Sequence, residues 1–161
     1  MSEQTEQERE TQMETAKHIE RVQFFVHIFS DLIIQIVKNH DYSKFGDEEF
    51  QFFVKYTPKL KGSTYGSDEY KQFLKEMQPA IDHHYKVNRH HTEHFANGIA
   101  GMNLLDLVEM FCDWMAAIER HADGDIYKSI EINKKRFGFD SILESIFKNT
   151  AKVFLKEKEK N

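Results

Sequence analysis

The chain is poor in residues that interrupt helices, with only two prolines and seven glycines among its 161 residues. Long, uninterrupted helices are therefore expected. The single cysteine, Cys112, excludes an intrachain disulfide, and its place in an apolar run favours a buried structural thiol over a nucleophile. There is neither an apolar run of transmembrane length nor a leading apolar signal segment, so we expect a cytoplasmic protein without a membrane partner.

Basic residues are also too few to indicate a surface for duplex nucleic acid. Lys and Arg total 22 against 27 Asp and Glu, which gives a formal net charge of −5. A duplex-binding surface normally needs a clustered basic patch, so no duplex nucleic-acid partner is expected. A Gly-rich phosphate-binding loop is missing too. Neither absence excludes a nucleotide, because a bound metal ion can supply positive charge locally.

The sequence does contain apolar residues at helical spacing, and hydrophobic residues make up 40 % of it. This periodicity predicts helices over about 18–40, 68–88, 103–121, 125–136 and 140–156, with a short helix after Asp47 and a loop over 57–67. Strand-like alternation is not seen. We therefore predict an all-α, single-domain helical bundle of about five to seven helices. It would span residues 13–156, between a flexible polar lead at 1–12 and a charged tail at 157–161.

Histidines concentrate at two places in the chain. The pair His40–Asp41 ends the first apolar run, and the segment HHYKVNRHHTEH supplies a second group: His83, His84, His90, His91 and His94. Imidazole and carboxylate groups are ordinary ligands of divalent metal ions. Helical spacing places His84 and His91 on the inward face and the other three histidines of the segment on a neighbouring, wetter face. We therefore favour His84 and His91 as ligands.

Asp113 is the candidate ligand on the helix over 103–121. It lies in a polar stripe with Asp106 and Glu109, beside the apolar stripe of the same helix. Such a stripe commonly faces water, so a solvated acidic face is the alternative interpretation.

His18 opens the apolar stripe that His40 ends. In one straight helix the two would lie about 33 Å apart, too far to share a metal ion. A chain reversal at FSDL, where Ser30 could cap a second helix, would bring them together. If the helix is continuous instead, the site would consist of His40, Asp41, His84, His91 and Asp113. Both arrangements stay open.

Basic side chains near these ligands could meet a phosphate group. Lys44 follows the His40–Asp41 pair by three residues, where it could contact a substrate phosphate or pair with a carboxylate. Lys134, Lys135 and Arg136 form a short basic cluster. A surface ion pair or a solvated cluster is the more frequent use of such residues.

Together, a His, an HD pair followed by SK, and a distant helical Asp resemble the HD superfamily of metal-dependent phosphohydrolases. This resemblance places His18, His40, Asp41 and Asp113 at metal-binding positions. The strings HDYSKF, PAIDHHYKVNRHHTEHF and DLVEMFCDWMAA also resemble an uncharacterised family of bacterial and phage proteins, over about residues 15–156. The likeness implies an HD-like helical fold in a bacterial cell or a phage-infected host, and no established activity.

The first functional hypothesis is a metal-dependent phosphohydrolase acting on a nucleotide or small phosphate ester. One or two divalent ions (Mn, Zn, Fe, Co or Ni) would be held by ligands drawn from His18, His40, Asp41, His84, His91 and Asp113. Asp41 would orient the attacking water, and Lys44 or His91 would stabilise the phosphate.

The second hypothesis is a non-catalytic binding module that uses the same pocket to sequester a nucleotide ligand, or that binds a host protein. A third is a helical protein whose histidines are merely structural. A homodimer also stays open, because the 14 phenylalanines could either fill one core or leave an apolar patch.

Overall fold

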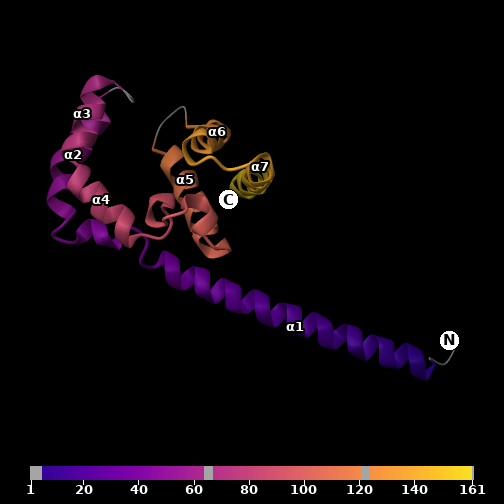
Figure 1. The fold of residues 1–161 in the computed structure, drawn as a ribbon. Helices are drawn as coiled ribbons and strands as arrows, with labels where there is room; N and C mark the ends of the chain where they lie inside the picture. The colour runs from indigo at the N-terminus through magenta and orange to yellow at the C-terminus, as the bar shows by residue number, and fades with distance from the viewer. Residues whose placement is uncertain (1–4, 64–66, 121–123, 161) are drawn as a thin grey trace. The chain divides into compact units, whose positions relative to one another are not determined.

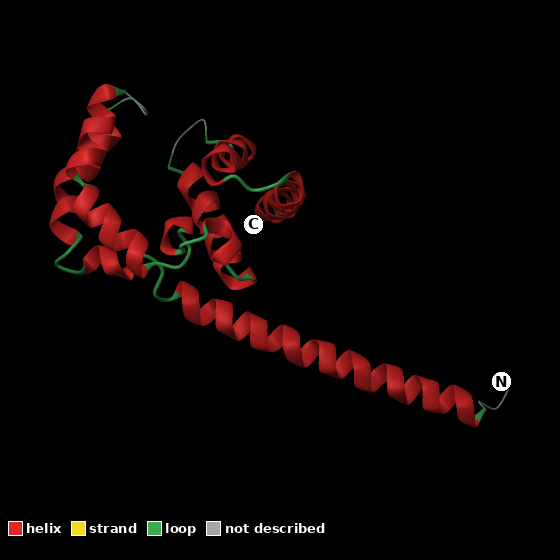
Figure 2. Ribbon diagram, in the orientation of Figure 1, coloured by secondary structure: helices red, strands yellow, loops and turns green. Residues whose placement is uncertain are grey.

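The computed structural model describes residues 5–63, 67–120 and 124–160. Within these ranges the chain forms seven α-helices, three short 3-10 helices and no strand, which confirms the predicted all-α fold (Figures 1 and 2). The α-helices are α1 (Glu6–Val37), α2 (Phe50–Gly62), α3 (Asp68–Glu76), α4 (Gln78–Val87), α5 (Leu104–Ile118), α6 (Ile126–Phe137) and α7 (Ser141–Lys158). The 3-10 helices are η1 (Tyr42–Phe45), η2 (Thr92–His94) and η3 (Gly98–Gly101). The chain divides into two compact units, Met1–Lys38 and Asn39–Asn161.

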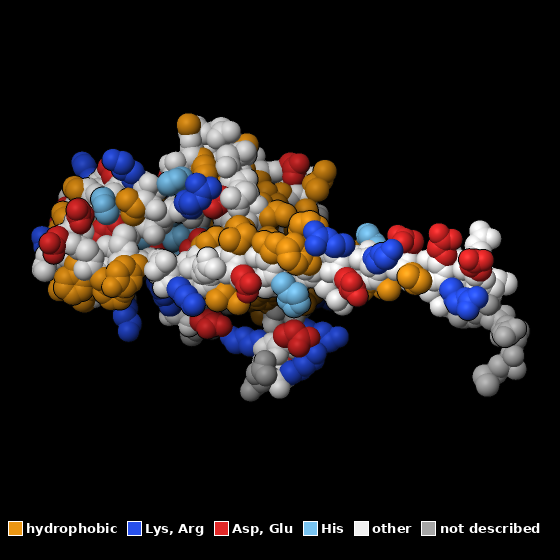
Figure 3. All heavy atoms as spheres, turned by 90° about the horizontal axis from the view of Figure 1, so that it is seen from below, with side chains coloured by type: hydrophobic (Ala, Val, Ile, Leu, Met, Phe, Trp, Pro, Cys, Tyr) orange, Lys and Arg blue, Asp and Glu red, His pale blue; other side chains and the backbone are white. Residues whose placement is uncertain are grey.

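The first unit consists of α1. A capping box starts this helix, because the Thr5 hydroxyl accepts a hydrogen bond from the Glu8 backbone and the Glu8 carboxylate accepts one from the Thr5 backbone. Residues 6–12 of the predicted polar lead belong to α1, whereas residues 1–4 lie outside the described part. Large apolar side chains gather in the C-terminal half of α1 (Figure 3). No helix of the described residues has the length and apolar content needed to cross a bilayer.

In the second unit, α2 packs against α3, and α3 packs against α4. The predicted loop over 57–67 is wrong at its start, because α2 continues through Pro58 to Gly62. Buried Tyr56 donates a hydrogen bond to Glu76 of α3 and so holds this part of α2 in place. The predicted helix over 68–88 is two helices, separated at Met77. Pro79 lies in the first turn of α4, where its missing N–H costs no helical hydrogen bond.

The other helices of this unit, α5, α6 and α7, enclose the main hydrophobic core. Its buried members are Met110, Phe111, Trp114, Ile126, Ile130, Phe139, Phe147 and Ala151. Phe147 of α7 lies parallel to Phe111 and edge-on to Trp114, with ring centroids 5.8 and 5.3 Å apart. The predicted positions of these three helices are confirmed to within three residues at each end. This packing fixes the rotation of α5 about its axis, and hence the direction in which its acidic residues point.

Candidate metal centre

Side chains from four segments of the second unit converge on one point. They come from the chain just before η1, from α4, from the loop between α4 and η2, and from α5. Their ligand atoms form three overlapping groups, each within 4.8 Å: Asp41 with His84, His90 and His91; His40 with Asp41 and Asp113; and His40 with His90 and Glu109. The structure thus brings together the site predicted for a continuous first helix.

Asp41 lies at the centre of this cluster. Its Oδ1 is 3.1 Å from Nε2 of His84 and 3.4 Å from Nε2 of His90, and its Oδ2 is 3.6 Å from Nε2 of His40. Lys44, one turn of η1 later, donates a hydrogen bond to Oδ2. Asp41 has a φ of 58°, the only positive φ of a non-glycine residue among those described. Asp tolerates this left-handed conformation better than most residues, and strained backbone often marks a functional position.

Glu49 positions two histidines of α4 through their Nδ1 atoms. Its carboxylate is fully buried, and its two oxygens lie 2.8 Å from Nδ1 of His83 and 2.9 Å from Nδ1 of His84. Because a carboxylate only accepts hydrogen bonds, Nδ1 of each ring must carry the proton. Nε2 of His84 is the nitrogen that faces Asp41, and in the neutral ring it is the one that carries the lone pair. This is the carboxylate–histidine arrangement that orients ligands in metal sites.

Glu109 of α5 holds two further histidines in the same way. Its Oε1 is 2.9 Å from Nδ1 of His40 and 3.2 Å from Nδ1 of His90, and the residue is only 5 % exposed. This geometry makes Glu109 a hydrogen-bond acceptor that positions two rings. Its carboxylate oxygen is also close enough to both rings to share a metal ion with them. Nε2 of both rings is left facing Asp41.

Several polar atoms at the centre have no hydrogen-bond partner among the described residues. These are Oδ1 of Asp41 and Nε2 of His90 and His91, all of them buried. Oδ1 of Asp41 is close to the ring nitrogens of His84 and His90, but these contacts lack the alignment of hydrogen bonds. Buried polar atoms are nearly always paired, and lone pairs that lie this close together could hold a cation. The donor set fits a divalent ion of the Zn or Mn type.

The protonation of the metal-free site affects how a metal ion could bind. Burial, together with repulsion from His90 and His84, lowers the pKa of His91 to about 3, so its imidazole is neutral at pH 7. Interactions with the carboxylates of Asp113 and Glu109 raise the pKa of His40 to about 10. A protonated His40 thus provides part of the positive charge that these carboxylates need. Metal binding would have to release that proton.

The pKa of Asp41 is below its ordinary value. Burial opposes its ionisation, but the interactions with His84, His90 and Lys44 outweigh that effect. Asp41 is therefore a carboxylate at neutral pH, as metal ligation requires.

His18 could share a metal ion with His40 only if the chain reversed between them. The predicted reversal at FSDL is absent, because α1 runs unbroken from Glu6 to Val37. His18 lies about 28 Å from Val37 along the helix axis at 1.5 Å per residue. The three residues that follow Val37 span at most about 11 Å, too little to return His40 to His18. The prediction of His18 as a ligand beside His40 of the same chain is therefore wrong.

Sequence reasoning placed His90 on a wetter face, and this is also wrong, because His90 is 2 % exposed. The helical spacing does not extend that far, since α4 ends at Val87 and Asn88 has extended backbone angles. The loop that follows is fixed by Arg89, which pairs through two hydrogen bonds with buried Asp106 at the start of α5. This anchor lets neighbouring His90 and His91 both point inward.

Glu49 and Glu109 were missed as site residues. Glu109 had a usable signal, because it precedes Asp113 by four residues and shares its helix face. The partners of Glu49 lie 34 and 35 residues later in the chain, and no short-range spacing connects them. Lys44 lies where the sequence placed it, beside Asp41.

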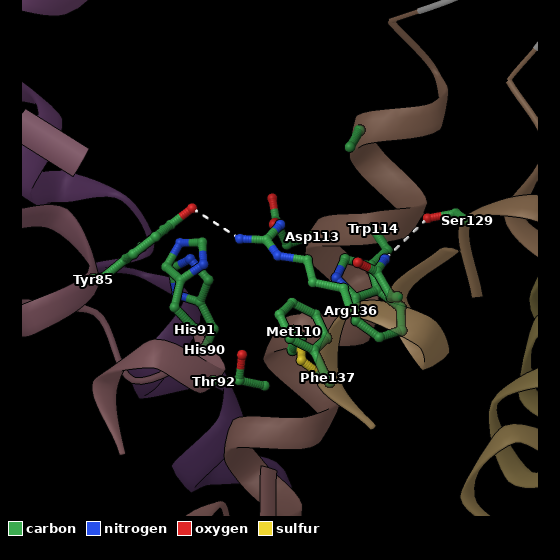
Figure 4. A pocket seen from close by; sticks show the side chains of 12 residues that line it. Tyr85, His90, His91, Thr92, Met110, Asp113, Trp114, Ser129, Arg136 and Phe137 are labelled. Carbon is green, nitrogen blue, oxygen red and sulfur yellow. Dashed lines mark hydrogen bonds between the residues drawn. The ribbon is translucent and has the colours of Figure 1, made fainter. Parts of the chain in front are cut away.

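A cavity of about 200 Å³ lies next to the cluster (Figure 4). Three of the cluster residues, His90, His91 and Asp113, line it. The rest of its wall comes mainly from α5 and α6: Met110, Trp114, Ala117, Ser129, Asn133, Arg136 and Phe137, with Tyr85 and Thr92. An ion at the cluster would therefore border a space large enough for a small ligand.

Comparison with known proteins gives a family and no activity. No curated protein and no solved structure matches the chain. A family model described as a family of unknown function, DUF5662, matches residues 7–159. This agrees with the predicted membership of an uncharacterised family. Because the match covers nearly the whole sequence, the chain belongs to the DUF5662 family.

Proposed function

We propose that this protein is a metal-dependent phosphohydrolase that acts on a nucleotide or a small phosphate ester in the cytoplasm. One observation carries the proposal: buried nitrogens of His90 and His91, two residues that line the cavity, lie within 4.8 Å of an oxygen of Asp41, and none of these three atoms has a hydrogen-bond partner among the described residues. A structural cluster would be expected to satisfy these atoms by hydrogen bonds, whereas a catalytic metal site needs them free. The likeness to the HD superfamily points to the same chemistry.

The metal would be held by Asp41, His84, His90 and His91, the group with the most ligands. His40, Asp41 and Asp113 form a group that could hold a second ion, and Asp41 belongs to both. A divalent ion at such a site lowers the pKa of a bound water and neutralises charge that develops on phosphoryl oxygens.

The protein's own residues would have distinct tasks in the hydrolysis. Water adds to phosphorus, the bond to the ester oxygen breaks, and the products are an alcohol and inorganic phosphate. Asp41 accepts a hydrogen bond from the water and so orients it. Lys44, held beside Asp41, supplies a cation for the phosphoryl oxygens. His91 is neutral at pH 7, so it can act as a metal ligand.

The first experiment measures metal in untagged protein by elemental mass spectrometry, with Asp41→Ala and His27→Ala variants. His27 is an exposed residue of α1, so its variant removes one histidine and leaves the cluster intact. We expect near-stoichiometric metal in the wild type and the His27 variant, and none in the Asp41 variant. Equal metal content in all three proteins would contradict the proposed site.

The second experiment tests turnover. The wild type is supplied in turn with Mn, Zn, Fe, Co and Ni, and release of inorganic phosphate is followed with p-nitrophenyl phosphate and with nucleoside mono-, di- and triphosphates. We expect metal-dependent release that the Asp41 variant lacks. A ligand that binds and is recovered intact after denaturation would instead identify a module that sequesters nucleotides.

A further inference from the structure

Three basic residues end α6, and the structure gives them different surroundings. Lys134 binds Glu144 of α7 with its Nζ 2.5 Å from Oε2. Lys135 is exposed and makes no ion pair among the described residues. Arg136 alone lines the cavity beside the candidate metal centre. Of the three basic residues, Arg136 is thus the one whose guanidinium lies at the cavity.

Arg136 connects three segments around the cavity. Its Nη2 donates hydrogen bonds to Oη of Tyr85 on α4, at 3.1 Å, and to Oε1 of Glu93 on η2, at 2.6 Å. Figure 4 shows the side chain extending from α6 toward Tyr85 and the His90–His91 pair. Both hydrogen bonds use the same terminal nitrogen. A fork of two parallel N–H groups, from Nη2 with either Nη1 or Nε, therefore becomes available to a phosphate once Nη2 releases Glu93.

The pair between Arg136 and Glu93 is easy to open. Their side chains are 51 % and 32 % exposed, so water screens the attraction, and such pairs contribute little to stability. A phosphate monoester carries nearly two negative charges at neutral pH, whereas a diester carries one. A monoester dianion is thus the better competitor for the guanidinium now paired with Glu93.

The remaining lining residues limit the size of the charged group. Among the described residues that line the cavity, Arg136 is the one Lys or Arg side chain. A polyphosphate chain usually meets several cations along its length, whereas the single guanidinium of the cavity wall suits a single phosphoryl group. Trp114 and Phe137 offer apolar surface, and the Asn133 amide offers hydrogen bonds, to the alcohol part of the ester.

We propose that the cavity binds a phosphate monoester, and that Arg136 breaks its hydrogen bond with Glu93 and donates hydrogen bonds to the phosphoryl oxygens instead. This inference rests on the proposed function, because it assumes that the phosphoryl group lies beside the metal centre. Glu93 would act as a placeholder that keeps Arg136 at the cavity when no substrate is bound.

The test uses inorganic phosphate as the probe and titration calorimetry as the measurement, on full-length protein with and without added Mn²⁺. Arg136→Gln should weaken phosphate binding roughly 10- to 100-fold, since it removes a charge-assisted pair of hydrogen bonds. Glu93→Gln should strengthen binding several-fold, because it removes the competing carboxylate. Lys135→Gln, which removes a neighbouring cation outside the cavity, should change binding less than twofold.

The opposite signs of the two main variants separate a binding role from a structural one. If Arg136 and Glu93 merely connect α6 to η2, both variants should weaken phosphate binding alike, or leave it unchanged, and either result would overturn the proposal. If Arg136→Gln fails to fold, the sign of the Glu93→Gln effect still decides.

Failure of this inference is distinguishable from failure of the proposed function. Phosphate binding that depends on Arg136 in a protein without turnover would support the monoester pocket and remove the hydrolase. Turnover of monoesters with an unchanged KM in Arg136→Gln would support the hydrolase and contradict the role of Arg136 in binding the phosphoryl group.

Discussion

Glu49→Gln is the substitution that tests most directly how the site is held together. Glu49 is fully buried and accepts hydrogen bonds from Nδ1 of both His83 and His84. A glutamine has nearly the same shape, but its side-chain NH₂ cannot accept. One of the two ring N–H groups would therefore face another donor. His83 is 32 % exposed at its side chain and can turn to water, whereas His84, at 6 %, cannot.

The size of the effect follows from these contacts. Losing one charge-assisted hydrogen bond in a buried setting costs about 1.5–3 kcal/mol. For a chain of this length, that corresponds to a fall of roughly 3–12 °C in the melting temperature. Because Glu49 fixes the tautomer in which Nε2 of His84 faces Asp41, metal affinity should also fall about 10- to 100-fold.

The assay compares Glu49→Gln with Glu48→Gln. Glu48 is the exposed neighbour, so its variant makes the same chemical change one residue earlier on the surface. Thermal unfolding and competition with a chelating dye would give stability and metal affinity for each protein. If the Glu49 variant binds metal within twofold of the Glu48 variant, the argument that a buried carboxylate orients His84 fails.

Three further outcomes are expected. His18→Ala should leave the metal content unchanged, as elemental analysis would show. Lys44→Met should lower kcat at least tenfold without loss of metal, because it removes the cation beside Asp41, and an unchanged kcat would argue against a catalytic lysine. In metal-free protein, His91 has a folded pKa of about 3 against 6.5 when unfolded, so stability should fall as the pH drops from 6.5 toward 3. His40 has a raised pKa of about 10, so its stabilising contribution should be complete below pH 6.5 and be lost as the pH rises toward 10. Urea midpoints measured across this pH range should no longer fall toward acid pH in His91→Phe, and should no longer fall toward alkaline pH in His40→Gln.

The helices were predictable because apolar periodicity is a local property of the sequence. It located α5, α6 and α7 to within a few residues, and the N-cap residues Asp125 and Asp140 mark two of the starts. The same local reasoning failed at Pro58, where packing of Tyr56 on α3 outweighs the helix-breaking tendency of proline.

The candidate site was predictable only in part, for a related reason. His40, Asp41 and Asp113 have residue types and a sequence order that already indicate a metal site. The roles of His90 and Glu49 depend on contacts between segments that lie far apart in the chain. His90 points inward because Arg89 anchors its loop to Asp106, and that contact spans 17 residues. A helical wheel carries no information on a loop held in this way.

These long-range contacts also explain why one site could couple metal binding to the stability of the second unit. Glu109 of α5 and Asp41, which precedes η1, both contact His90, which lies in the loop after α4. The cluster therefore links the group α2–α4 to α5, whose hydrophobic core lies among α5, α6 and α7. The link includes carboxylates that lie close together and whose repulsion a cation would relieve. Metal that binds only the folded arrangement must stabilise it in proportion to its affinity and concentration. The same contacts that would position a catalytic ion would thus also make that ion a structural connection between the two groups of helices.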